Sequence, residues 1–464
     1  MNVYEGFRDR RVVIAGLGYV GLTLAVAMAE EGFQVHGIEI RDDVLEKLAR
    51  GEPHFFEPGL EERLKLVVEQ GALTFSKSLQ RPFLATVYII TVGTPLDGNG
   101  AVRLDMIRNA TEQLAAAMND GALVILRSTV KVGTARNVVQ PILDAAGRRY
   151  EIAVCPERTL EGSALDELRR IPQIVGADEP GTVSRASQLF SFLTPTIVRV
   201  PSLETAEVIK LVDNTYRDVT FAFGNEVARL CNSLGVNSRD VIEAGRLSYP
   251  RTNVAFPGPV GGPCLEKDPH ILAESGRTCG VVTPLINAAR WINENQPQEV
   301  VRFLASFTAN LTDFPDSPVI SLLGLAFKGQ PETDDLRGTM ALPVLAALRE
   351  AFPAATFRGF DAVVAEQQID SVFGITPCAN IRDALRGTHL ALALNNHRVF
   401  AAHKLESLCQ GMARPGVYYD FWNMHKVGRF SLPENVYYIS LGNHGRPVAG
   451  QAPRARMHAA VGAA

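Results

Sequence analysis

The stretch Arg11–Gly21 reads RVVIAGLGYVG and decides the fold of the first part of the chain. It joins a short β-branched run to glycines in the spacing G-x-G-x-x-G. The alanine-rich segment 22–31 has helical spacing and stops at Gly32, and residues 34–39 predict a second strand that ends in an acid. This order is typical of a dinucleotide-binding βαβ unit: a strand, a glycine turn, a helix, and a second strand that ends in an acid.

The glycine turn also predicts how a dinucleotide binds. Glycines let backbone N–H groups at the start of the helix reach a pyrophosphate. Glu39 would accept hydrogen bonds from the adenosine ribose and repel a 2′-phosphate, which favours NAD over NADP, whereas Arg41 beside it could accommodate that phosphate. The cofactor-binding residues expected here are Gly16, Gly18, Tyr19, Val20, Gly21, Glu39 and Arg41.

Buried-type strands continue at 87–91 and 122–126, with a helical stretch at 104–118 between them. Thr94 follows the first of these strands and Thr129 follows the second. Ligands of an open parallel sheet bind beyond the carboxyl ends of its strands. We therefore expect both threonines beside a cofactor or substrate, although threonine also caps helices.

The next strand, at 150–154, runs into the sequence CPERTLEG. Glu157 and Glu161 lie four residues apart in it, with Arg158 between them. Such a turn could simply be solvated. Its position at the carboxyl end of a strand favours contact with a ligand instead.

A proline-free segment begins at Ser202, a plausible N-cap. Residues 203–235 predict one helix, which would be roughly 50 Å long at 1.5 Å per residue. That exceeds the diameter of a small domain, so we expect the helix to join two domains and to offer a dimer surface. Lys210 and Asn214 are one turn apart and share a face of it.

The stretch 258–269 reads GPVGGPCLEKDP and places Cys264 in a rigid loop. Glycine permits close backbone approach and proline restricts the loop, which suits the presentation of a thiol. Asp268 follows the cysteine by four residues. A tight turn around a buried, inert cysteine is the alternative interpretation.

A break at 311–318 marks a further domain boundary. The strand expected at 319–323 meets GLAFKG at 324–329, an echo of the first glycine turn, and places the cation of Lys328 where phosphate would bind. Strands expected at 389–394 and 417–420 complete a second nucleotide-type domain. The segment 442–464 is rich in Ala, Gly, Pro and Arg and carries no acid, which predicts disorder.

The overall composition narrows the classes of function. The chain has 464 residues, enough for two or three domains, and a formal charge of −4, which gives no electrostatic footprint for nucleic acid or an acidic membrane. Its six cysteines are scattered, without the spacing of a metal site, so we expect a reducing compartment and no bound metal. The start lacks the apolar core of a signal peptide, and no run approaches the roughly 18 apolar residues of a membrane span. A cytoplasmic protein is expected.

Six motifs in order resemble the UDP-glucose/GDP-mannose dehydrogenase family of nucleotide-sugar 6-dehydrogenases over about residues 10–440. They are G-x-G-x-x-G, S-T-V at 128–130, P-E-x-x-x-E at 156–161, K-x-x-x-N at 210–214, the G-G-x-C-x-x-x-D loop, and G-L-x-F-K at 324–328. Each motif alone is weak, but the six together are specific.

The resemblance implies an α/β fold with two Rossmann-like, doubly wound parallel-sheet domains joined by a long central helix and a helical middle domain. The expected bounds are 1–202 for the NAD-binding domain, 203–312 for the central dimerisation domain with the cysteine loop, 313–441 for the UDP-sugar-binding domain, and 442–464 for the tail.

The resemblance also implies that a UDP-sugar C6 alcohol is oxidised to a carboxylate by two NAD, with Cys264 as nucleophile. Lys210 and Asn214 would stabilise the oxygen at C6. Asp268 and Glu161 would manage protons and water, with Thr129 positioning that water. Which carboxylate is the base stays open. A homodimer or higher homo-oligomer supplying polysaccharide precursors is also implied.

Two details concern the substrate. The sequences PERT at 156–159 and PRTN at 250–253 resemble those of the family branch that acts on UDP-N-acetylhexosamines, such as UDP-N-acetylmannosamine. The UDP-glucose branch has phenylalanine and serine where this chain has Arg158 and Pro263. The implied substrate-binding residues are Glu157, Arg158, Glu161, Lys210, Asn214, Arg251, Gly261 and Lys328. Of these, Arg251 is implied to reach the substrate of a neighbouring subunit. Arg337 is implied to contact NAD.

Three other functions compete with this interpretation. A UDP-glucose 6-dehydrogenase would share the whole mechanism. A single-step β-hydroxyacid dehydrogenase would share the Rossmann domain and the K-x-x-x-N helix but leave the Cys264 loop unexplained. A non-catalytic NAD or UDP-sugar sensor would tolerate loss of the cysteine, lysine and asparagine, yet all three are present.

Overall fold

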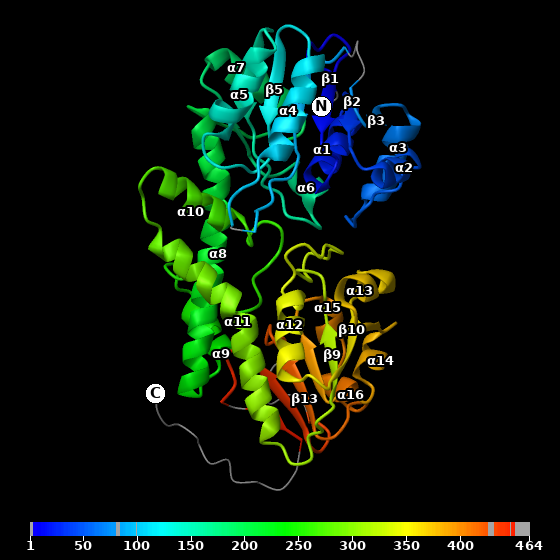
Figure 1. The fold of residues 1–464 in the computed structure, drawn as a ribbon, viewed down its shortest axis with the longest axis vertical. Helices are drawn as coiled ribbons and strands as arrows, with labels where there is room; N and C mark the ends of the chain where they lie inside the picture. The colour runs from blue at the N-terminus through cyan, green and yellow to red at the C-terminus, as the bar shows by residue number, and fades with distance from the viewer. Residues whose placement is uncertain (1–2, 80–83, 99, 426–430, 446, 451–464) are drawn as a thin grey trace. The chain divides into compact units, whose positions relative to one another are not determined.

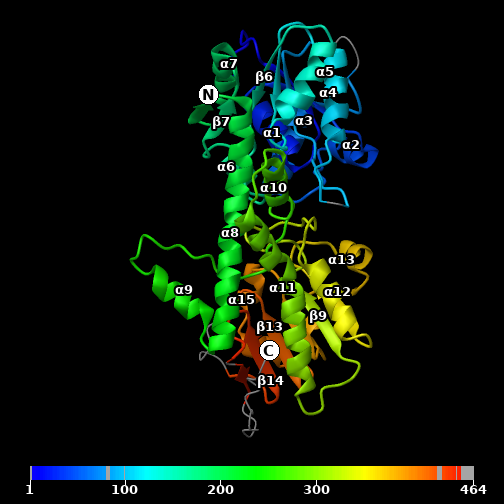
Figure 2. The ribbon, with the colours of Figure 1, turned by 60° about the vertical axis from the view of Figure 1, so that its left-hand side comes forward.

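The computed structural model describes residues 3–79, 84–98, 100–425, 431–445 and 447–450. The chain divides into two compact units, whose elements are labelled in Figures 1 and 2. The first unit comprises Met1–Val219, Pro263–Arg290 and Pro331–Asp335, and the second comprises Thr220–Gly262, Trp291–Gln330 and Leu336–Ala464. Each unit contains one large sheet.

The first unit has an eight-stranded sheet in the order β3-β2-β1-β4-β5-β6-β7-β8. Neighbouring strands are parallel except β6 and β7. The strands are β1 (Arg11–Ala15), β2 (Gln34–Ile38), β3 (Leu73–Ser76), β4 (Val87–Ile90), β5 (Ala122–Leu126), β6 (Tyr150–Val154), β7 (Gln173–Gly176) and β8 (Ile197–Val200). The order reverses between β1 and β4, which is where doubly wound sheets bind ligands.

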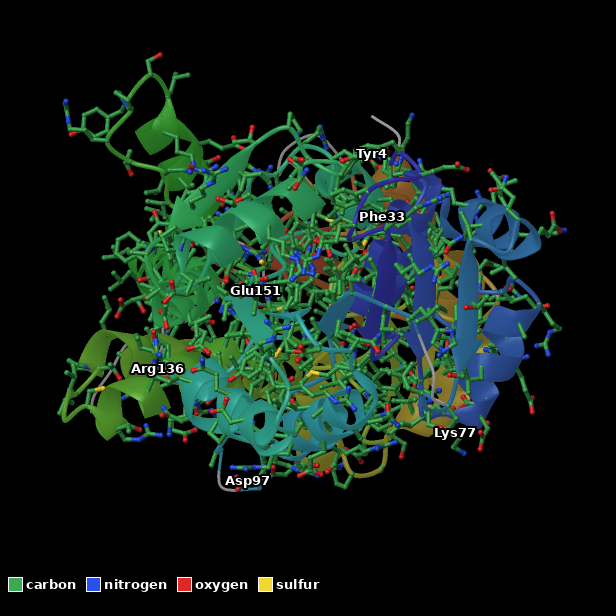
Figure 3. All side chains as sticks on the ribbon, turned by 90° about the horizontal axis from the view of Figure 1, so that it is seen from above. Tyr4, Phe33, Lys77, Asp97, Arg136 and Glu151 are labelled. Carbon is green, nitrogen blue, oxygen red and sulfur yellow. The ribbon has the colours of Figure 1, made fainter. Side chains whose placement is uncertain are left out.

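The sheet is apolar on both faces because helices cover both of them. Along β1, Val12 and Ile14 enter one core, while Val13 and Ala15 enter the other. This alternation is what a parallel strand with two covered faces requires. Seen from above, Phe33 lies among the drawn side chains of the interior, whereas Lys77 and Asp97 lie near the edge of the view (Figure 3).

The helices of the first unit follow the expected βαβ alternation. They are α1 (Tyr19–Glu30), α2 (Asp42–Ala49), α3 (Leu60–Glu69), α4 (Asp105–Ala117), the π-helical turn η1 (Ala135–Val139), α5 (Gln140–Ala145), α6 (Ala164–Glu167), α7 (Pro180–Phe190) and α10 (Asp268–Thr278). The predicted helix at 104–118 and the strands at 87–91, 122–126 and 150–154 are all confirmed within one residue.

The long helix expected at 203–235 is confirmed as α8 (Leu203–Leu234), whose residues belong in turn to the first and then the second unit. The hydroxyl oxygen of Ser202 accepts the N–H of Thr205 at 3.1 Å, so the N-cap is also confirmed. Gly235 ends the helix with φ of 67°, a left-handed conformation that favours glycine. A second long helix, α11 (Pro284–Ala309), likewise contributes to both units.

The second unit has a seven-stranded sheet in the order β11-β10-β9-β12-β13-β14-β15, which repeats the doubly wound pattern. Within this sheet, only the β14–β15 pair is antiparallel among the strand pairs of the described residues. The strands are β9 (Val319–Leu323), β10 (Thr356–Phe360), β11 (Thr376–Pro377), β12 (Leu390–Ala393), β13 (Gly416–Asp420), β14 (Val436–Ser440) and β15 (Val448–Ala449). The α/β fold with two Rossmann-like sheets is therefore confirmed.

Shorter helices complete the second unit. They are α9 (Ser238–Arg246), α12 (Ala341–Ala351), α13 (Glu366–Phe373), α14 (Ile381–Leu385), α15 (Arg398–Ala402) and α16 (Leu405–Cys409). As in the first unit, alternate residues of a central strand enter different cores: Leu390 and Leu392 of β12 enter one, Ala391 and Ala393 the other. No helix of the described residues is long and apolar enough to cross a bilayer.

The predicted start of the disordered tail, residue 442, is too early in the chain. Residues 442–445 and 447–450 are part of the second unit, and Val448 pairs with Tyr438 in the antiparallel β14–β15 ladder. The strand has two residues, Val448 and Ala449, and is held by pairing with β14 and by packing of Val448 against the core, which the composition of the segment does not reveal. The rest of that segment, 451–464, lies outside the described residues.

Candidate functional site

The glycine turn of the first unit has the geometry of a dinucleotide cradle. Gly16 adopts φ of 94°, and a Cβ on Gly21 would lie 1.9 Å from the carbonyl oxygen of Gly16. A Cβ on Gly18, by contrast, would meet no atom within 4 Å. Gly16 therefore makes the tight turn, Gly21 permits close packing of α1, and Gly18 leaves open space for a pyrophosphate. The residues present fit NAD.

Glu39 stands at the end of β2 as expected and reaches back to this turn. Its carboxylate accepts the N–H of Leu17 at 3.2 Å and the N–H of Arg41 at 3.0 Å. The guanidinium of Arg41 makes a bidentate pair with Asp43, at 2.6 and 3.2 Å. Arg41 is thus engaged by a carboxylate, which opposes its use for a 2′-phosphate and agrees with NAD as the cofactor.

Tyr19 and Val20, the remaining predicted residues of the turn, form the first residues of α1 and are partly buried. The N–H groups at this end of a helix favour the binding of an anion such as a pyrophosphate.

The two predicted threonines belong to one contact. The hydroxyl of Thr94 is buried and donates to the carbonyl oxygen of Thr129 at 2.5 Å. Thr94 therefore joins the segments that follow β4 and β5, and this bond positions Thr129, whose side chain is partly exposed. Neither threonine caps a helix among the described elements.

Glu157 lies in the interior beside Arg127, and the substrate contact expected of it stays a prediction. Its carboxylate pairs with the fully buried guanidinium of Arg127 and accepts the N–H groups of Arg158 and Thr159 at 2.7 and 2.8 Å. Burial works to raise the pKa of Glu157, but Arg127, the N–H of Thr159 and the charge of Lys210 outweigh it and hold that pKa below its usual range. Internal charge pairing accounts for this glutamate.

The other two predicted residues of this turn, Arg158 and Glu161, are partly buried. Arg158 is half-buried and donates from Nε to the Asp213 carboxylate on α8 at 2.9 Å. Glu161 is partly buried in the loop between β6 and α6. Asp213 precedes Asn214, so Arg158 connects this turn to the helix face that carries the predicted lysine and asparagine.

The cysteine loop and α8 bring four predicted residues together in the first unit. Asp268 is fully buried, and its Oδ2 accepts the side-chain N–H of Asn214 at 2.6 Å. The backbone N–H of Asp268 donates to the carbonyl oxygen of Cys264 at 2.9 Å. Lys210 is buried one turn before Asn214 on α8. Cys264 as a residue is partly buried beside these polar groups.

The charges of this cluster act on the thiol. Burial raises the pKa of Cys264, and the carboxylates of Asp268 and Glu161 raise it further. The ammonium groups of Lys210 and Lys267 oppose them and lower it. A thiol among two cations and two anions differs from the inert, apolar buried cysteine that was the alternative interpretation.

Two residues that hold this cluster in place, Lys267 and Arg290, were not predicted from the sequence. Lys267 donates from Nζ to the Asp268 Oδ1 at 2.6 Å, so both carboxylate oxygens of Asp268 are bound. Arg290 donates to Asp218 at 2.7 Å and to the carbonyl oxygen of Leu265 at 2.9 Å, which fixes the residue after the cysteine. A lysine next to the aspartate was visible in the sequence, but a partner 25 residues away was not.

The glycines of the cysteine loop serve close packing within the second unit. A Cβ on Gly258 would lie 2.8 Å from the ring of Trp422, and one on Gly261 would lie 2.2 Å from the carbonyl oxygen of Gly338. Gly262 adopts φ of 93° and packs against Phe327. Contact with the backbone of Gly338 thus accounts for a glycine at 261, and the substrate contact expected there stays a prediction.

The remaining predicted residues also belong to the second unit. Arg251 is exposed in the loop after α9, with its guanidinium 4.5 Å from the ring centre of Tyr249. Lys328 is partly buried at the glycine turn after β9, with Nζ 5.2 Å from the ring centre of Phe327. Arg337 is exposed in the segment before α12.

The second sheet contains a counterpart of the Glu39 arrangement that was also missed. Asp361 follows β10, and its Oδ2 accepts the N–H groups of Leu325 and Ala326 at 2.6 and 3.0 Å. Gly324 begins this turn with φ of 82°, and a Cβ there would lie 2.4 Å from the Asn395 side chain. A strand ending in an acid was the available signal, as it was for Glu39.

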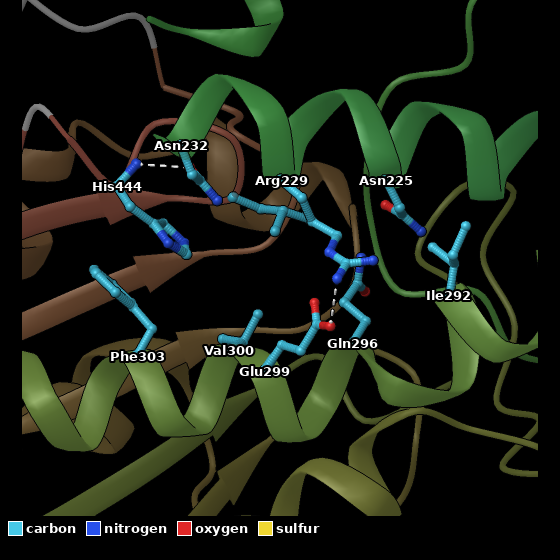
Figure 4. A pocket seen from close by; sticks show the side chains of 10 residues that line it. Asn225, Arg229, Asn232, Ile292, Gln296, Glu299, Val300, Phe303 and His444 are labelled. Atoms are coloured by element: carbon cyan, nitrogen blue, oxygen red, sulfur yellow. Dashed lines mark hydrogen bonds and ion pairs between the residues drawn. The ribbon is translucent and has the colours of Figure 1, made fainter. Parts of the chain in front are cut away.

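A separate pocket of about 170 Å³ lies in the second unit (Figure 4). It is lined by α8, α11 and the segment after β14, with an Arg229–Glu299 ion pair of 3.1 Å at its centre. The ring of His444 stacks on Phe303 at one end, and burial lowers the His444 pKa to about 3, so this ring is neutral. Its lining includes no residue predicted from the sequence.

Three consecutive stretches of the chain match domains of the UDP-glucose/GDP-mannose dehydrogenase family: the NAD binding domain at residues 10–194, the central domain at 204–295 and the UDP binding domain at 321–427.

Known proteins resemble the chain over most of its length. A UDP-N-acetyl-D-mannosamine dehydrogenase of Pyrococcus horikoshii is 34% identical over 74% of this chain and 81% of its own. A protein of the same name from Yersinia pestis is 31% identical over 86% of this chain and 96% of its own. A solved structure of the UDP-D-ManNAc dehydrogenase from Pyrococcus horikoshii covers 94% of this chain and 100% of its own, with a TM-score of 0.83 and 30% identity.

Proposed function

Because the chain belongs to the UDP-glucose/GDP-mannose dehydrogenase family, we propose that it oxidises UDP-N-acetyl-D-mannosamine at C6 to the uronic acid, with two NAD consumed per sugar. It is an NAD-dependent nucleotide-sugar 6-dehydrogenase. The observation that carries the mechanism is the cluster of Cys264, Asp268, Asn214 and Lys210 in one unit.

The chemistry explains why a thiol is needed. The first oxidation converts the C6 alcohol to an aldehyde. The aldehyde carbon bears a hydrogen but no hydroxyl group, so it cannot be oxidised in the same way a second time. Addition of the Cys264 S–H across the aldehyde C=O forms a thiohemiacetal, which again carries both a hydroxyl and a C–H. NAD, when bound, accepts the hydride at each oxidation.

The second oxidation leaves a thioester on Cys264. Water then attacks the thioester carbonyl, and the C–S bond breaks to release the carboxylate and restore the thiol. Two hydrides leave the substrate, and one water supplies the second carboxylate oxygen, so the atoms and electrons balance.

Lys210 and Asn214 stabilise the C6 oxygen during these steps. Negative charge develops on that oxygen as the hydroxyl loses its proton during each hydride transfer and as the thiol or water adds to the carbonyl. A buried ammonium and amide on one helix face can both donate to it. Such a donor contributes about 3 kcal/mol in measured enzymes. The Asn214–Asp268 hydrogen bond fixes the direction of the amide.

Asp268 and Glu161 are the candidate bases, and Thr129 is the candidate for holding the hydrolytic water. Asp268 has both oxygens engaged, by Asn214 and Lys267. Glu161 lies in the loop after β6, and its charge acts on the thiol. The carboxylate of Asp268 is thus held by two hydrogen bonds, whereas that of Glu161 lies on a loop.

The substrate assignment rests on Arg158 and Pro263, and on the names of the two relatives. A panel of UDP-N-acetylmannosamine, other UDP-N-acetylhexosamines, UDP-glucose and GDP-mannose, assayed for NAD reduction, tests it. We expect the highest kcat/KM with UDP-N-acetylmannosamine. Preference for UDP-glucose would establish the alternative function, and activity on GDP-mannose alone would overturn the branch.

Cys264→Ala separates the enzyme from a sensor. We expect this variant to bind NAD and UDP-sugar but to form no uronate. Full turnover without the thiol would refute the mechanism, and absence of oxidation of all the sugars by the unchanged chain would favour a non-catalytic sensor. Cys279→Ala, at an exposed cysteine, is the matched control.

A homodimer is part of the proposal. Large apolar side chains at Val212, Tyr216, Phe223, Leu230 and Leu234 are all exposed, and their spacing of four and seven residues places them on one face of α8. A second copy would cover this stripe. In a dimer, Arg251 of the partner subunit would reach the substrate, which agrees with the exposed loop that carries it.

Light scattering tests the dimer. The unchanged chain should give twice its mass of 50.4 kDa, and Phe223→Asp with Leu230→Asp should give that mass once. Val372→Asp is the control, since Val372 is equally exposed on α13, away from the stripe. A dimer that survives the double change would rule out this face.

The proposal places the enzyme in the cytoplasm, where its product would serve as a precursor for polysaccharide synthesis.

A further inference from the structure

The carboxylate of Glu57 lies where three segments of the first unit meet. Glu57 is buried in the loop between α2 and α3. It accepts the hydroxyl of Tyr19, the N–H of Gly162 at 2.6 Å and the N–H of Ala164 at 2.7 Å. The N–H of Gly162 also points to the Tyr19 hydroxyl oxygen at 2.7 Å. These four residues are called the Glu57 cluster below.

On one side, the cluster holds the dinucleotide turn. Tyr19 is the first residue of α1, directly after the open space at Gly18. Its ring packs against Phe55, with ring centres 4.8 Å apart. Burial and the Glu57 carboxylate raise the Tyr19 pKa, so its hydroxyl keeps its proton and donates.

On the other side, the cluster holds the loop that carries Glu161. Gly162 follows Glu161 directly and adopts φ of 82°. A Cβ on Gly162 would lie 2.5 Å from the carbonyl oxygen of Glu332, and the N–H of Phe56 donates to Asp334 at 3.0 Å. The segment 331–335 therefore packs against both loops, and little room remains for Glu161 to move independently of Glu57.

We propose that Glu57 and Tyr19 are positioning residues that couple NAD binding at the glycine turn to the placement of Glu161. The inference rests on the role of Glu161 given under the proposed function. The N–H groups of the first turn of α1 would hold the pyrophosphate of NAD, so binding there would fix Tyr19. Charge-assisted hydrogen bonds to one carboxylate then carry that constraint to Gly162 and Ala164.

Amide hydrogen exchange of the full-length chain, with and without saturating NAD and with no sugar present, tests the coupling. In the unchanged chain we expect NAD to slow exchange in the segment 161–164 by about tenfold. Tyr19→Phe keeps the ring on Phe55, and Glu57→Gln keeps the side-chain size. Both should bind NAD within about threefold of the unchanged affinity and lose most of the protection at 161–164.

Tyr150→Phe is the matched control. Tyr150 donates to Asp144 at 2.6 Å, also a tyrosine–carboxylate bond, but at the amino end of β6, the sheet edge opposite the glycine turn. It should keep the full protection. Equal protection in Tyr19→Phe and the unchanged chain would overturn the proposal, as would loss of NAD binding in Tyr19→Phe, since the hydroxyl would then serve binding alone.

Turnover gives the second readout. Tyr19→Phe should lower kcat by about tenfold while changing the KM for NAD by less than about twofold. If Glu57→Gln does not fold, Tyr19→Phe decides the question alone. If the unchanged chain oxidises no nucleotide-sugar, the proposed function fails, but the exchange experiment still tests whether NAD binding reaches the Glu161 loop.

Discussion

The side-chain amide of Asn214 donates to the buried carboxylate of Asp268 at 2.6 Å. This bond joins α8 to the first residue of α10, four residues after Cys264. Because the Asp268 N–H also donates to the Cys264 carbonyl oxygen, one aspartate fixes both the amide on α8 and the backbone of the cysteine. The thiol and the predicted oxyanion donors are thereby held in a single structure.

Replacement of Asp268 by Asn should change the thiol itself. The Asp268 carboxylate raises the pKa of Cys264, so Asp268→Asn should lower that pKa and speed alkylation of Cys264 near neutral pH. Turnover should nevertheless fall by about a hundredfold, because the groups held by the carboxylate lose their partner. Alkylation rates against pH, followed by mass spectrometry of the Cys264 peptide, give the result. Slower alkylation would show that the carboxylate does not act on the thiol in this way.

Glu157→Gln should damage stability rather than substrate binding. The change leaves the buried Arg127 without its charged partner, a loss that costs about 3–5 kcal/mol in comparable buried pairs. The melting temperature should fall by several degrees, while the KM for UDP-sugar stays within about twofold of the unchanged value. Glu112→Gln, at an exposed position of α4, controls for loss of a surface carboxylate. A large rise in KM with unchanged stability would instead establish Glu157 as a substrate ligand.

Asp43→Asn should relax the choice of cofactor. The Asp43 carboxylate engages the guanidinium of Arg41 at 2.6 Å, and its removal makes that cation available to a 2′-phosphate. We expect affinity for NADP to rise by about three- to tenfold with little change for NAD, as measured by calorimetry of each cofactor. The pair is exposed, so the effect should shrink in high salt. Unchanged NADP affinity would mean that Glu39 alone excludes the phosphate.

Glu207 should make the free energy of unfolding decrease as the pH rises toward neutrality. It lies one turn before Lys210 on α8, and its carboxylate accepts the N–H groups of Gly133 and Ala135 at 2.6 and 2.9 Å. Burial is the main cause that raises its pKa to about 7 from a usual 4.5. Between these values the folded state binds more protons than the unfolded state, so stability falls as pH rises from 4.5 to 7.

Urea unfolding at pH 5 and pH 8 measures this effect. The Glu207 contribution, about 3 kcal/mol, should be present at the lower pH and lost at the higher one. The pH dependence of Glu207→Gln should be weaker by that amount, whereas Glu112→Gln should follow the unchanged chain. An equal slope in Glu207→Gln and the unchanged chain would contradict a raised pKa at this site.

The sequence was sufficient where the signal is local. The run Arg11–Ala15, the glycine turn and Glu39 form one continuous segment, so their strands, helix and carboxylate could be placed before the structure. The 32-residue α8 was equally clear, because no proline interrupts it and Ser202 caps it. Both nucleotide-type sheets followed from such segments.

Long-range partners could not be predicted in this way. Position at the carboxyl end of a strand suggested that Glu157 faces a ligand, but only the fold shows Arg127 beneath it. Glu57 sits in a loop with no periodic pattern, and its partners lie 38 and 105 residues away. Asp361 differs, since its strand-ending acid repeats the Glu39 pattern and could have been found.

The amount of NADH formed per molecule of UDP-N-acetylmannosamine consumed tests the central claim most directly. If Cys264 carries the aldehyde through a thiohemiacetal and a thioester, complete conversion gives two NADH per sugar and a uronic acid product. One NADH per sugar, with an aldehyde as the product, would contradict the account.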